Sequence, residues 1–157
     1  MIASIKSRGF TIIEILFAVA VLVLITAIII VSWSKLNASQ ALEKSTASVA
    51  SVLDEARSLT LSAVGDSQYG VNLQESQLVL FKGDTYLPSD SDNRVTELHS
   101  AVGIRNISLS GGGVSVVFKR LTGSTDQYGT VELYLRLATT TKRLINIRAT
   151  GVIEIGL

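Results

Sequence analysis

Residues 8–33 read RGFTIIEILFAVAVLVLITAIIIVSW, and this stretch decides the fold. Its centre, residues 15–31, holds seventeen residues of which only Thr26 is polar. As an α-helix, residues 10–33 would be about 36 Å long, enough to cross a hydrocarbon core ~30 Å thick. We therefore expect a membrane-spanning helix near the N-terminus.

The segment before this helix, residues 1–9, carries Lys6 and Arg8 and no acidic residue. Basic residues beside a membrane helix favour the cytoplasmic side. At the other end of the helix, Trp33 and Lys35 suit the opposite interface, where amphipathic side chains are common. The sequence thus predicts one crossing, with everything after residue 33 outside the cytoplasm.

Two ordinary interpretations of this segment remain open. In a cleaved secretory signal, Ser32-Trp33-Ser34 would supply the small-x-small site, although the apolar run exceeds the usual ~7–15 residues and Trp33 is bulky. A plain anchor explains everything except Glu14. A carboxylate costs ~2.5–3.5 kcal/mol at the centre of a bilayer, and less near the interface that a glutamate close to a helix end can reach.

A third interpretation accounts for the basic leader and for Glu14 together. The run Arg8-Gly9-Phe10-Thr11-Ile12-Ile13-Glu14, followed by an uninterrupted apolar helix, resembles the class III signal of type IV prepilins. The resemblance implies that a membrane peptidase cuts between Gly9 and Phe10 and methylates the new amino group of Phe10. It also makes Glu14 the fifth residue of the mature chain, where that family keeps a glutamate.

The pairing implied by this resemblance is physically coherent. Cleavage would leave a cationic amine at Phe10, and a charge inside an apolar filament core is tolerated only when it is paired. Glu14 of a neighbouring subunit can neutralise that amine. The same pair would fix the register between subunits, as polar groups do in apolar helix seams.

Beyond the apolar segment the sequence changes from helical to alternating periodicity. Apolar residues recur at helical spacings up to Val64, without Pro or Gly, and Gly65-Asp66 then gives a stop signal. Short β-branched runs follow, separated by turn residues. The expected strands are residues 69–73, 77–82, 95–99, 104–109, 114–120, 130–138, 142–148 and 152–155.

These patterns predict an α+β fold in which a long N-terminal helix packs on a C-terminal antiparallel β head, and the resemblance to type IV prepilins implies that this fold is pilin-like. We divide the chain into a leader (1–9), a transmembrane or filament-core helix (10–33), an amphipathic helix (34–64) and the β-rich head (65–157). Within the head, Val131, Leu133, Leu135 and Leu137 alternate with Glu132, Tyr134 and Arg136, which predicts a sheet with one face in water.

Composition and motifs argue against an enzyme. With 0 Cys and 1 His there is no thiol chemistry and no multi-histidine metal site, and His99 stands in no catalytic motif. The segment from Asp90 to Asn93 resembles a calcium loop, but Val95 stands where the glycine belongs and the closing acid is missing, so we expect a solvated turn. Residues 110–113, Ser-Gly-Gly-Gly, read as a hairpin turn. No cofactor and no metal is expected.

Charge is unevenly distributed along the chain. Residues 34–100 carry 5 basic and 9 acidic side chains, whereas residues 101–157 carry 7 basic and 3 acidic ones. A basic strand face can bind DNA phosphates or the acidic head of another pilin. The candidate contacts are Lys119, Arg120, Lys142, Arg143 and Arg148. We expect a solvated basic face or a contact with another pilin, with DNA as the less favoured alternative.

The order of elements, with Arg143-Leu144-Ile145-Asn146-Ile147-Arg148 ahead of Gly151, is similar to the GspH/FimT group. That group comprises minor pseudopilins of type II secretion and minor pilins of type IV pili. The resemblance implies a non-enzymatic subunit of the bacterial inner membrane that later enters a pilus or pseudopilus. Its implied partners are other pilins, prepilin peptidase and the inner-membrane assembly platform. A DNA-binding competence pilin and an anchored domain that never polymerises remain alternatives.

Overall fold

The computed structural model describes residues 10–156, with side chains for residues 10–27 and 36–156. The chain divides into two compact units, Met1–Asn37 and Ala38–Leu157. From here on we call the second unit the head; it includes the last part of the helix as well as the predicted β-rich head (65–157). The expected leader, residues 1–9, lies outside the described residues.

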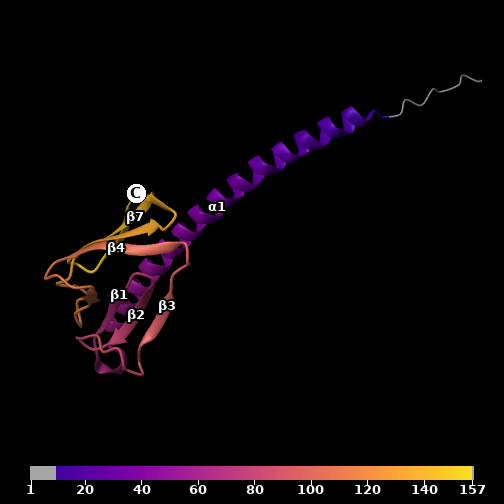
Figure 1. Cartoon of the computed structure of the whole chain (residues 1–157). Coiled ribbons are helices and arrows are strands. Elements are labelled where there is room, and N and C mark those ends of the chain that lie inside the picture. The colour runs from indigo at the N-terminus through magenta and orange to yellow at the C-terminus, as the bar shows by residue number, and fades with distance from the viewer. Residues whose placement is uncertain (1–9, 157) are drawn as a thin grey trace, which may run out of the picture. The chain divides into compact units, whose positions relative to one another are not determined.

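A single helix, α1, spans Ile12–Leu61 and so belongs to both units (Figure 1). It ends four residues before the predicted stop at Gly65. The cause is tertiary: the buried hydroxyl of Thr60 accepts the backbone N–H of Tyr69 at 2.9 Å, which holds the start of the first strand against the last turn. The chain then reverses through Ala63, at φ 48°, and the short 3-10 helix η1, Val64–Asp66.

Within the head, α1 buries one face. Leu42, Val49, Leu53 and Ala56, spaced by seven, four and three residues, are each at most 2% exposed. This is the spacing of an amphipathic helix, and it confirms the stripe expected for this half of the helix. The hydroxyl of Thr46, buried on the same face, donates to the carbonyl oxygen of Leu42 at 2.8 Å and is therefore satisfied inside the core.

The described residues form eight strands in two antiparallel four-stranded sheets. The first sheet has the order β3–β2–β1–β5 and the second has the order β4–β6–β7–β8. The strands are β1 Tyr69–Leu73, β2 Gln77–Lys82, β3 Arg94–Glu97, β4 Val102–Leu109, β5 Ser115–Val117, β6 Gly129–Leu135, β7 Ala138–Ile147 and β8 Ile153–Gly156. All eight overlap the strands expected from the sequence, which confirms the α+β class.

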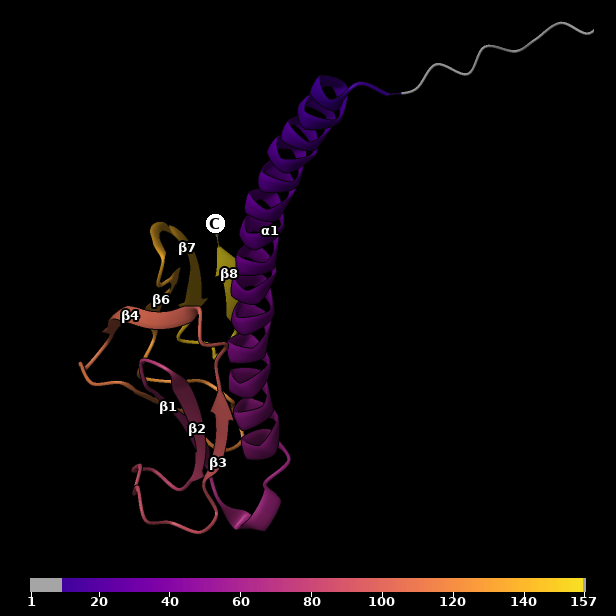
Figure 2. The ribbon, with the colours of Figure 1, turned by 45° about the vertical axis from the view of Figure 1, so that its right-hand side comes forward.

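One hydrophobic core joins the head's part of α1 to both sheets. The strands of both sheets lie on one side of this part of the helix (Figure 2). Val71 and Leu80 come from the first sheet, and Leu133 and Ile145 from the second. Each is at most 3% exposed. The helix therefore contributes part of the core on which both sheets pack.

The connection between β6 and β7 differs from the prediction. We expected a strand over residues 130–138, but β6 ends at Leu135 and Leu137 is 99% exposed. The register explains the difference: Tyr134 pairs with Lys142 while Leu135 pairs with Ala138, so residues 139–141 have no partners opposite them. The chain bulges at this tip and turns Leu137 away from the core.

The glycine-rich turn also differs from the prediction. Gly111, Gly112 and Gly113 have φ of 81°, 74° and 80°, in the left-handed region that glycine tolerates best. However, they connect β4 of the second sheet to β5 of the first, so this segment is a crossover between sheets and not a hairpin turn. Periodicity along the chain could not distinguish the two, because sheet membership is set by long-range pairing.

Two glycines, in the loops before β6 and before β8, lie against α1 at Arg57. The carbonyl oxygen of Gly123 accepts a hydrogen bond from Nε of Arg57 at 3.1 Å. Gly151, at φ 78°, packs so closely on this contact that a Cβ there would lie 1.8 Å from the same oxygen. The contact fastens the loops before β6 and before β8 to the helix.

Candidate assembly site and the ion pairs of the head

The first turn of α1 is capped by Thr11. Its carbonyl oxygen accepts the N–H groups of Glu14 at 3.1 Å and Ile15 at 3.2 Å, and its hydroxyl oxygen lies 3.3 Å from the N–H of Glu14. Threonine is a favourable residue at this position because its oxygen satisfies an N–H that the helix leaves open. The helix therefore begins two residues after Phe10, the predicted mature N-terminus.

Glu14 lies in this first turn, where the helix dipole favours negative charge. Its side chain is exposed, and within residues 10–156 its carboxylate forms no ion pair or hydrogen bond. Phe10 is 79% exposed. The two predicted assembly residues thus lie within the first turn and its immediate approach, and Gly9 lies outside the described residues.

Every side chain described between positions 10 and 27 is exposed, although most of them are apolar. Ile12, Ile13 and Phe17 are 81%, 73% and 72% exposed, and the pattern continues on all sides of the helix. The hydroxyl of Thr26 donates to the carbonyl oxygen of Leu22 at 2.7 Å, so the single polar residue of the run is satisfied within its own helix. Among the described residues, no helix is long and apolar enough to cross a membrane.

The five candidate contact residues of the basic face all form ion pairs inside the head. Lys119 pairs with Asp126 at 2.7 Å, Arg120 with Asp66, Lys142 with Glu132 at 2.9 Å, Arg143 with Glu43 at 2.5 Å and Arg148 with Glu154 at 2.8 Å. Two of these partners, Asp66 and Glu43, precede residue 100. The basic excess of residues 101–157 is thus used in part to bind the acidic first half of the head.

Glu132 is the centre of one such group, and its burial corrects the sequence prediction. We expected it on the wet face of the sheet, but it is only 5% exposed. Its carboxylate accepts from Nε of Arg105 at 2.6 Å and from Nζ of Lys142 at 2.9 Å. Arg105 also stacks on the ring of Tyr134, 4.4 Å from its centroid, so long side chains cover the carboxylate.

These contacts hold the pKa of Glu132 below its ordinary value of 4.5: hydrogen bonds from Lys142, then from Arg105, favour the charged form, while burial opposes them. A carboxyl group whose pKa is lowered on folding stabilises the head above its unfolded pKa and loses that contribution as the pH falls through the folded value. The head should therefore lose stability as the pH falls below about 4.5.

We expect Glu132→Gln to lower the free energy of unfolding by ~2 kcal/mol near neutral pH, because it removes two charge-assisted hydrogen bonds and leaves two neighbouring cations unpaired. The measurement is urea unfolding of the full chain in detergent micelles, followed through the near-ultraviolet circular dichroism of tyrosine. All 4 tyrosines lie in the head, whereas the 1 tryptophan does not. The variant should also show a shallower loss of stability below pH 4.5 than the wild type.

The matched control is Glu154→Gln, whose ion pair with Arg148 is exposed on both sides. Exposed pairs contribute ~0–1 kcal/mol, so this variant should stay close to wild type. Equal losses of unfolding free energy in the two variants would show that burial does not strengthen the ion pairs of Glu132.

No protein-family model matches the sequence, and no curated protein is detectably similar to it. Among solved structures, the chain is similar to the crystal structure of the type IV minor pilin FimU of Pseudomonas aeruginosa, strain PAO1. The two are 14% identical, and the match has a TM-score of 0.52 over 74% of this chain and 93% of that one. The chain has a type IV pilin-like fold. This confirms the fold that the sequence resemblance implied.

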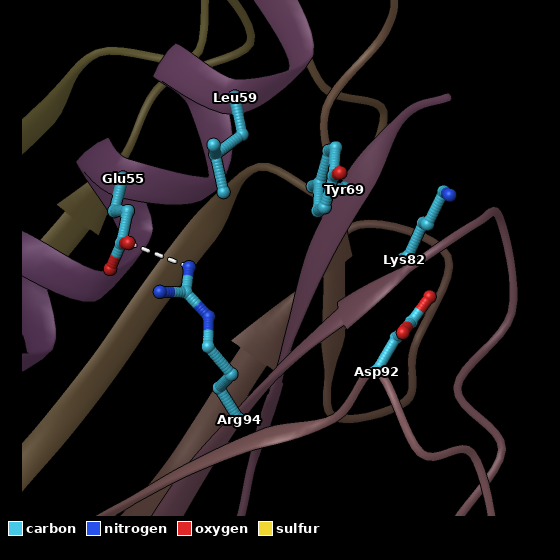
Figure 3. A pocket seen from close by; sticks show the side chains of 6 residues that line it. All are labelled: Glu55, Leu59, Tyr69, Lys82, Asp92 and Arg94. Atoms are coloured by element: carbon cyan, nitrogen blue, oxygen red, sulfur yellow. Dashed lines mark hydrogen bonds and ion pairs between the residues drawn. The ribbon is translucent and has the colours of Figure 1, made fainter. Parts of the chain in front are cut away.

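An open cleft of about 350 Å³ lies in the pilin-like head between the last turns of α1 and the first sheet (Figure 3). The ion pair between Glu55 and Arg94, 2.6 Å long, lies across it, and Tyr69 forms part of its wall. Lys82 and Asp92 complete the polar lining. Of the residues that the structure describes, no Ser, Thr, Cys or His side chain lines this cleft.

The acidic segment and the histidine of the pilin-like head form hydrogen bonds within the head. The N–H of Asp92 donates to the carboxylate of Asp90 at 2.9 Å, and the amide of Asn93 donates to the carbonyl oxygen of Leu87 at 2.7 Å. Across the described residues, no three His, Asp or Glu side chains gather as a metal site would require. His99 lies two residues after the end of β3, and its Nδ1 accepts the N–H of Ala101 at 3.1 Å.

Sequence reasoning missed Glu132, Arg105 and Arg57 as structural residues of the pilin-like fold. One signal was available for Glu132, which is the only acidic residue among residues 127–153 and stands between two apolar strand positions. Its cationic partners are far away in sequence, at positions 105 and 142, and only strand pairing brings them to it.

Proposed function

We propose that this chain is a structural, non-enzymatic pilin-like subunit, most similar in organisation to the GspH/FimT group of minor pilins and minor pseudopilins. In this proposal it is first anchored in the bacterial inner membrane through residues 10–33, with the head outside the cytoplasm. It is then cleaved between Gly9 and Phe10, methylated at Phe10 and assembled through α1 with other pilins. Prepilin peptidase and the assembly platform are its processing and assembly partners.

The observation that carries this proposal is the surface of α1 before the head. Apolar side chains are exposed all round the helix from Phe10 to Ala27, and the carboxylate of Glu14 lies exposed in the first turn among them. Such a surface must be covered by lipid or by other apolar helices. Lipid alone leaves the carboxylate unexplained, whereas a bundle of helices with free N-terminal amines supplies both the apolar cover and the countercharge.

We propose no nucleic-acid partner. The five candidate cations of the basic face are each ion-paired within the head, so a phosphate that bound to one of them would have to replace a carboxylate that is already in place. Lys and Arg side chains strengthen DNA binding when they neutralise phosphates and so release the counterions condensed on the DNA, which requires side chains that are available to the phosphates.

The test of the processing step is Gly9→Phe. Glycine leaves the scissile bond unobstructed, so a bulky side chain should leave unprocessed precursor in the membrane fraction. Mass spectrometry of the wild-type protein should find a mature chain that begins at methylated Phe10. Ser7→Phe is the matched control, because it places the same side chain in the leader and keeps both basic residues.

Two outcomes would contradict the proposed processing. Normal cleavage of Gly9→Phe would remove Gly9 from the site. A mature N-terminus at Ser34 or Lys35 would establish the secretory-signal interpretation, in which the apolar segment is discarded and cannot take part in assembly.

A further inference from the structure

The tip of the β6–β7 hairpin presents an apolar side chain that nothing in the head covers. Leu137 is 99% exposed, and the residues that follow it, Ala138 to Thr141, are exposed and uncharged. Single exposed leucines are common on protein surfaces, but a fully exposed one at the end of a hairpin is held out from the head with no neighbour to shield it.

The tip is also held firmly in place. Arg136 donates its backbone N–H to the carbonyl oxygen of Ala101 at 2.9 Å, and its guanidinium donates to Glu75 at 2.5 Å and to the carbonyl oxygen of Val102 at 3.2 Å. On the other side, Arg105 donates to the carbonyl oxygen of Thr139 at 2.9 Å. Leu137 is therefore presented by an ordered turn, so little conformational entropy remains to be lost when it binds.

Two contacts with α1 fix the direction in which this tip points. Arg143 of β7 pairs with Glu43, whereas Gly151, after β7, packs at Arg57. Between Glu43 and Arg57 the helix rises ~21 Å, and between Arg143 and Gly151 an extended chain covers ~26 Å. Because these lengths are similar and the residue numbers increase the same way along both segments, β7 runs in the same direction as α1. The hairpin tip precedes Arg143 and lies at the end of the head where the chain enters at Ala38 (Figure 2).

The charges of the head are arranged along the same direction. Around the tip, four cations face three carboxylates, which leaves one positive charge: Arg105, Arg136, Lys142 and Arg143 pair with Glu43, Glu75 and Glu132. Within residues 38–156, the acids without an ion pair include Asp84, Asp90 and Asp92. These three belong to the β2–β3 connection, which begins beside Gly65 at the far end of α1.

We propose that the β6–β7 tip docks on the surface of an anionic bilayer while the subunit is held in the membrane before assembly, with Leu137 inserted between lipid headgroups. This inference rests on the proposed membrane insertion of residues 10–33. An apolar knob with a positive surround at the entry end suits an anionic lipid surface, and the unpaired acids at the opposite end face away from it. Docking would hold the head in one orientation on the membrane.

The absence of cysteine allows single labels to test this in the full chain. Ala138→Cys, beside Leu137, carries an environment-sensitive fluorophore, and the protein is reconstituted in vesicles of phosphatidylethanolamine with phosphatidylglycerol that contain headgroup-level nitroxide lipids. The label should be quenched. In phosphatidylcholine vesicles the docked fraction relative to the undocked one should fall about fivefold, the factor for one positive charge at an anionic surface.

Two controls distinguish docking from general proximity to lipid. Adding Leu137→Ser to the Ala138 label should lower the docked-to-undocked ratio about tenfold, since a buried leucine side chain is the larger contribution. A label at Ser89→Cys, in the same connection as the exposed Leu87 at the far end of the head, should not be quenched in either vesicle.

A further label at Leu22→Cys separates this inference from the proposed function. It is read in vesicles whose nitroxide groups are on the lipid acyl chains, because residue 22 would lie near the centre of the bilayer. Quenching at position 22 without quenching at position 138 would overturn the docking and leave the membrane anchor intact. No quenching at position 22 would overturn both. An emission shift at position 138 that nitroxide lipids do not affect would show that protein, such as a second copy of this chain, covers the tip, and would also overturn lipid docking.

Discussion

Glu14→Ala should be cleaved and retained in the membrane normally but should fail to enter filaments. In the proposed assembly, the carboxylate of Glu14 neutralises the amine of Phe10 of a neighbouring subunit inside an apolar bundle. Removing one member of a fully buried pair leaves the other charge uncompensated, at a cost of ~3–5 kcal/mol. The membrane-held monomer is spared this cost, because alanine replaces a charge that bilayers disfavour.

The structure sharpens this expectation. Because Thr11 already caps the first turn through its own oxygen atoms, the start of the helix does not depend on the side chain of Glu14. The substitution to alanine, a strong helix former, should therefore leave α1 intact, so a failure to assemble cannot be attributed to a lost helix. The carboxylate is exposed and carries no partner within residues 10–156, which leaves it free to meet another subunit.

The measurement is crosslinking to the adjacent pilin through introduced cysteines, scored together with the N-terminal sequence of the subunit. Bulk pilus yield is a poor measure for a minor subunit at a filament tip, which lacks a neighbour on one side. Thr26→Ala is the matched control: it removes the other polar group of the apolar run, whose hydroxyl is bonded within its own helix. Wild-type crosslinking of Glu14→Ala would refute the pairing, because assembly would then not depend on the carboxylate.

The second large effect is expected at Gly151. Gly151→Ala must place a Cβ 1.8 Å from the carbonyl oxygen of Gly123, well inside van der Waals contact, at a backbone φ of 78° that alanine adopts poorly. The left-handed conformation costs ~1–2 kcal/mol by itself. Relief of the clash requires the two loops to separate and breaks the hydrogen bond between Arg57 and Gly123. We expect a total loss of about 4 kcal/mol, in the range of the most damaging single substitutions.

Gly112→Ala separates these two costs. Gly112 has nearly the same φ, 74°, but a Cβ there would meet nothing within 4 Å. This variant should lose only the ~1–2 kcal/mol of the backbone conformation. Both are measured by urea unfolding of the full chain in detergent micelles, with tyrosine circular dichroism as the signal. Similar losses in the two variants would mean that the loops move apart at little cost and that the contact at Arg57 does not fasten them.

The fold was largely accessible from the sequence, because its signals are local. The apolar run, the stripe that includes Leu42, Val49 and Leu53, and the alternating runs after Gly65 each express the period of one element. Those periods follow from backbone geometry alone. All eight strands were expected near their observed places for this reason.

The candidate site divides in the same way. Gly9, Phe10 and Glu14 were predicted because they stand within a few residues of one another in a single motif. For the basic residues, the sequence showed an excess of positive charge but not which carboxylates they pair with. Arg143 and Glu43 are 100 positions apart and meet only after β7 has packed beside α1.

The sequence by itself determined a long apolar helix with a carboxylate in its first turn and a β-rich head behind it, because helical and strand periodicity depend only on neighbouring residues. The tertiary structure alone decided that Glu132 is buried, that the glycine turn joins two sheets, and that Leu137 projects from the head. Each of these depends on strand register. A strand register is fixed when side chains from distant segments pack into one core, so it depends on contacts that no single segment of the sequence contains.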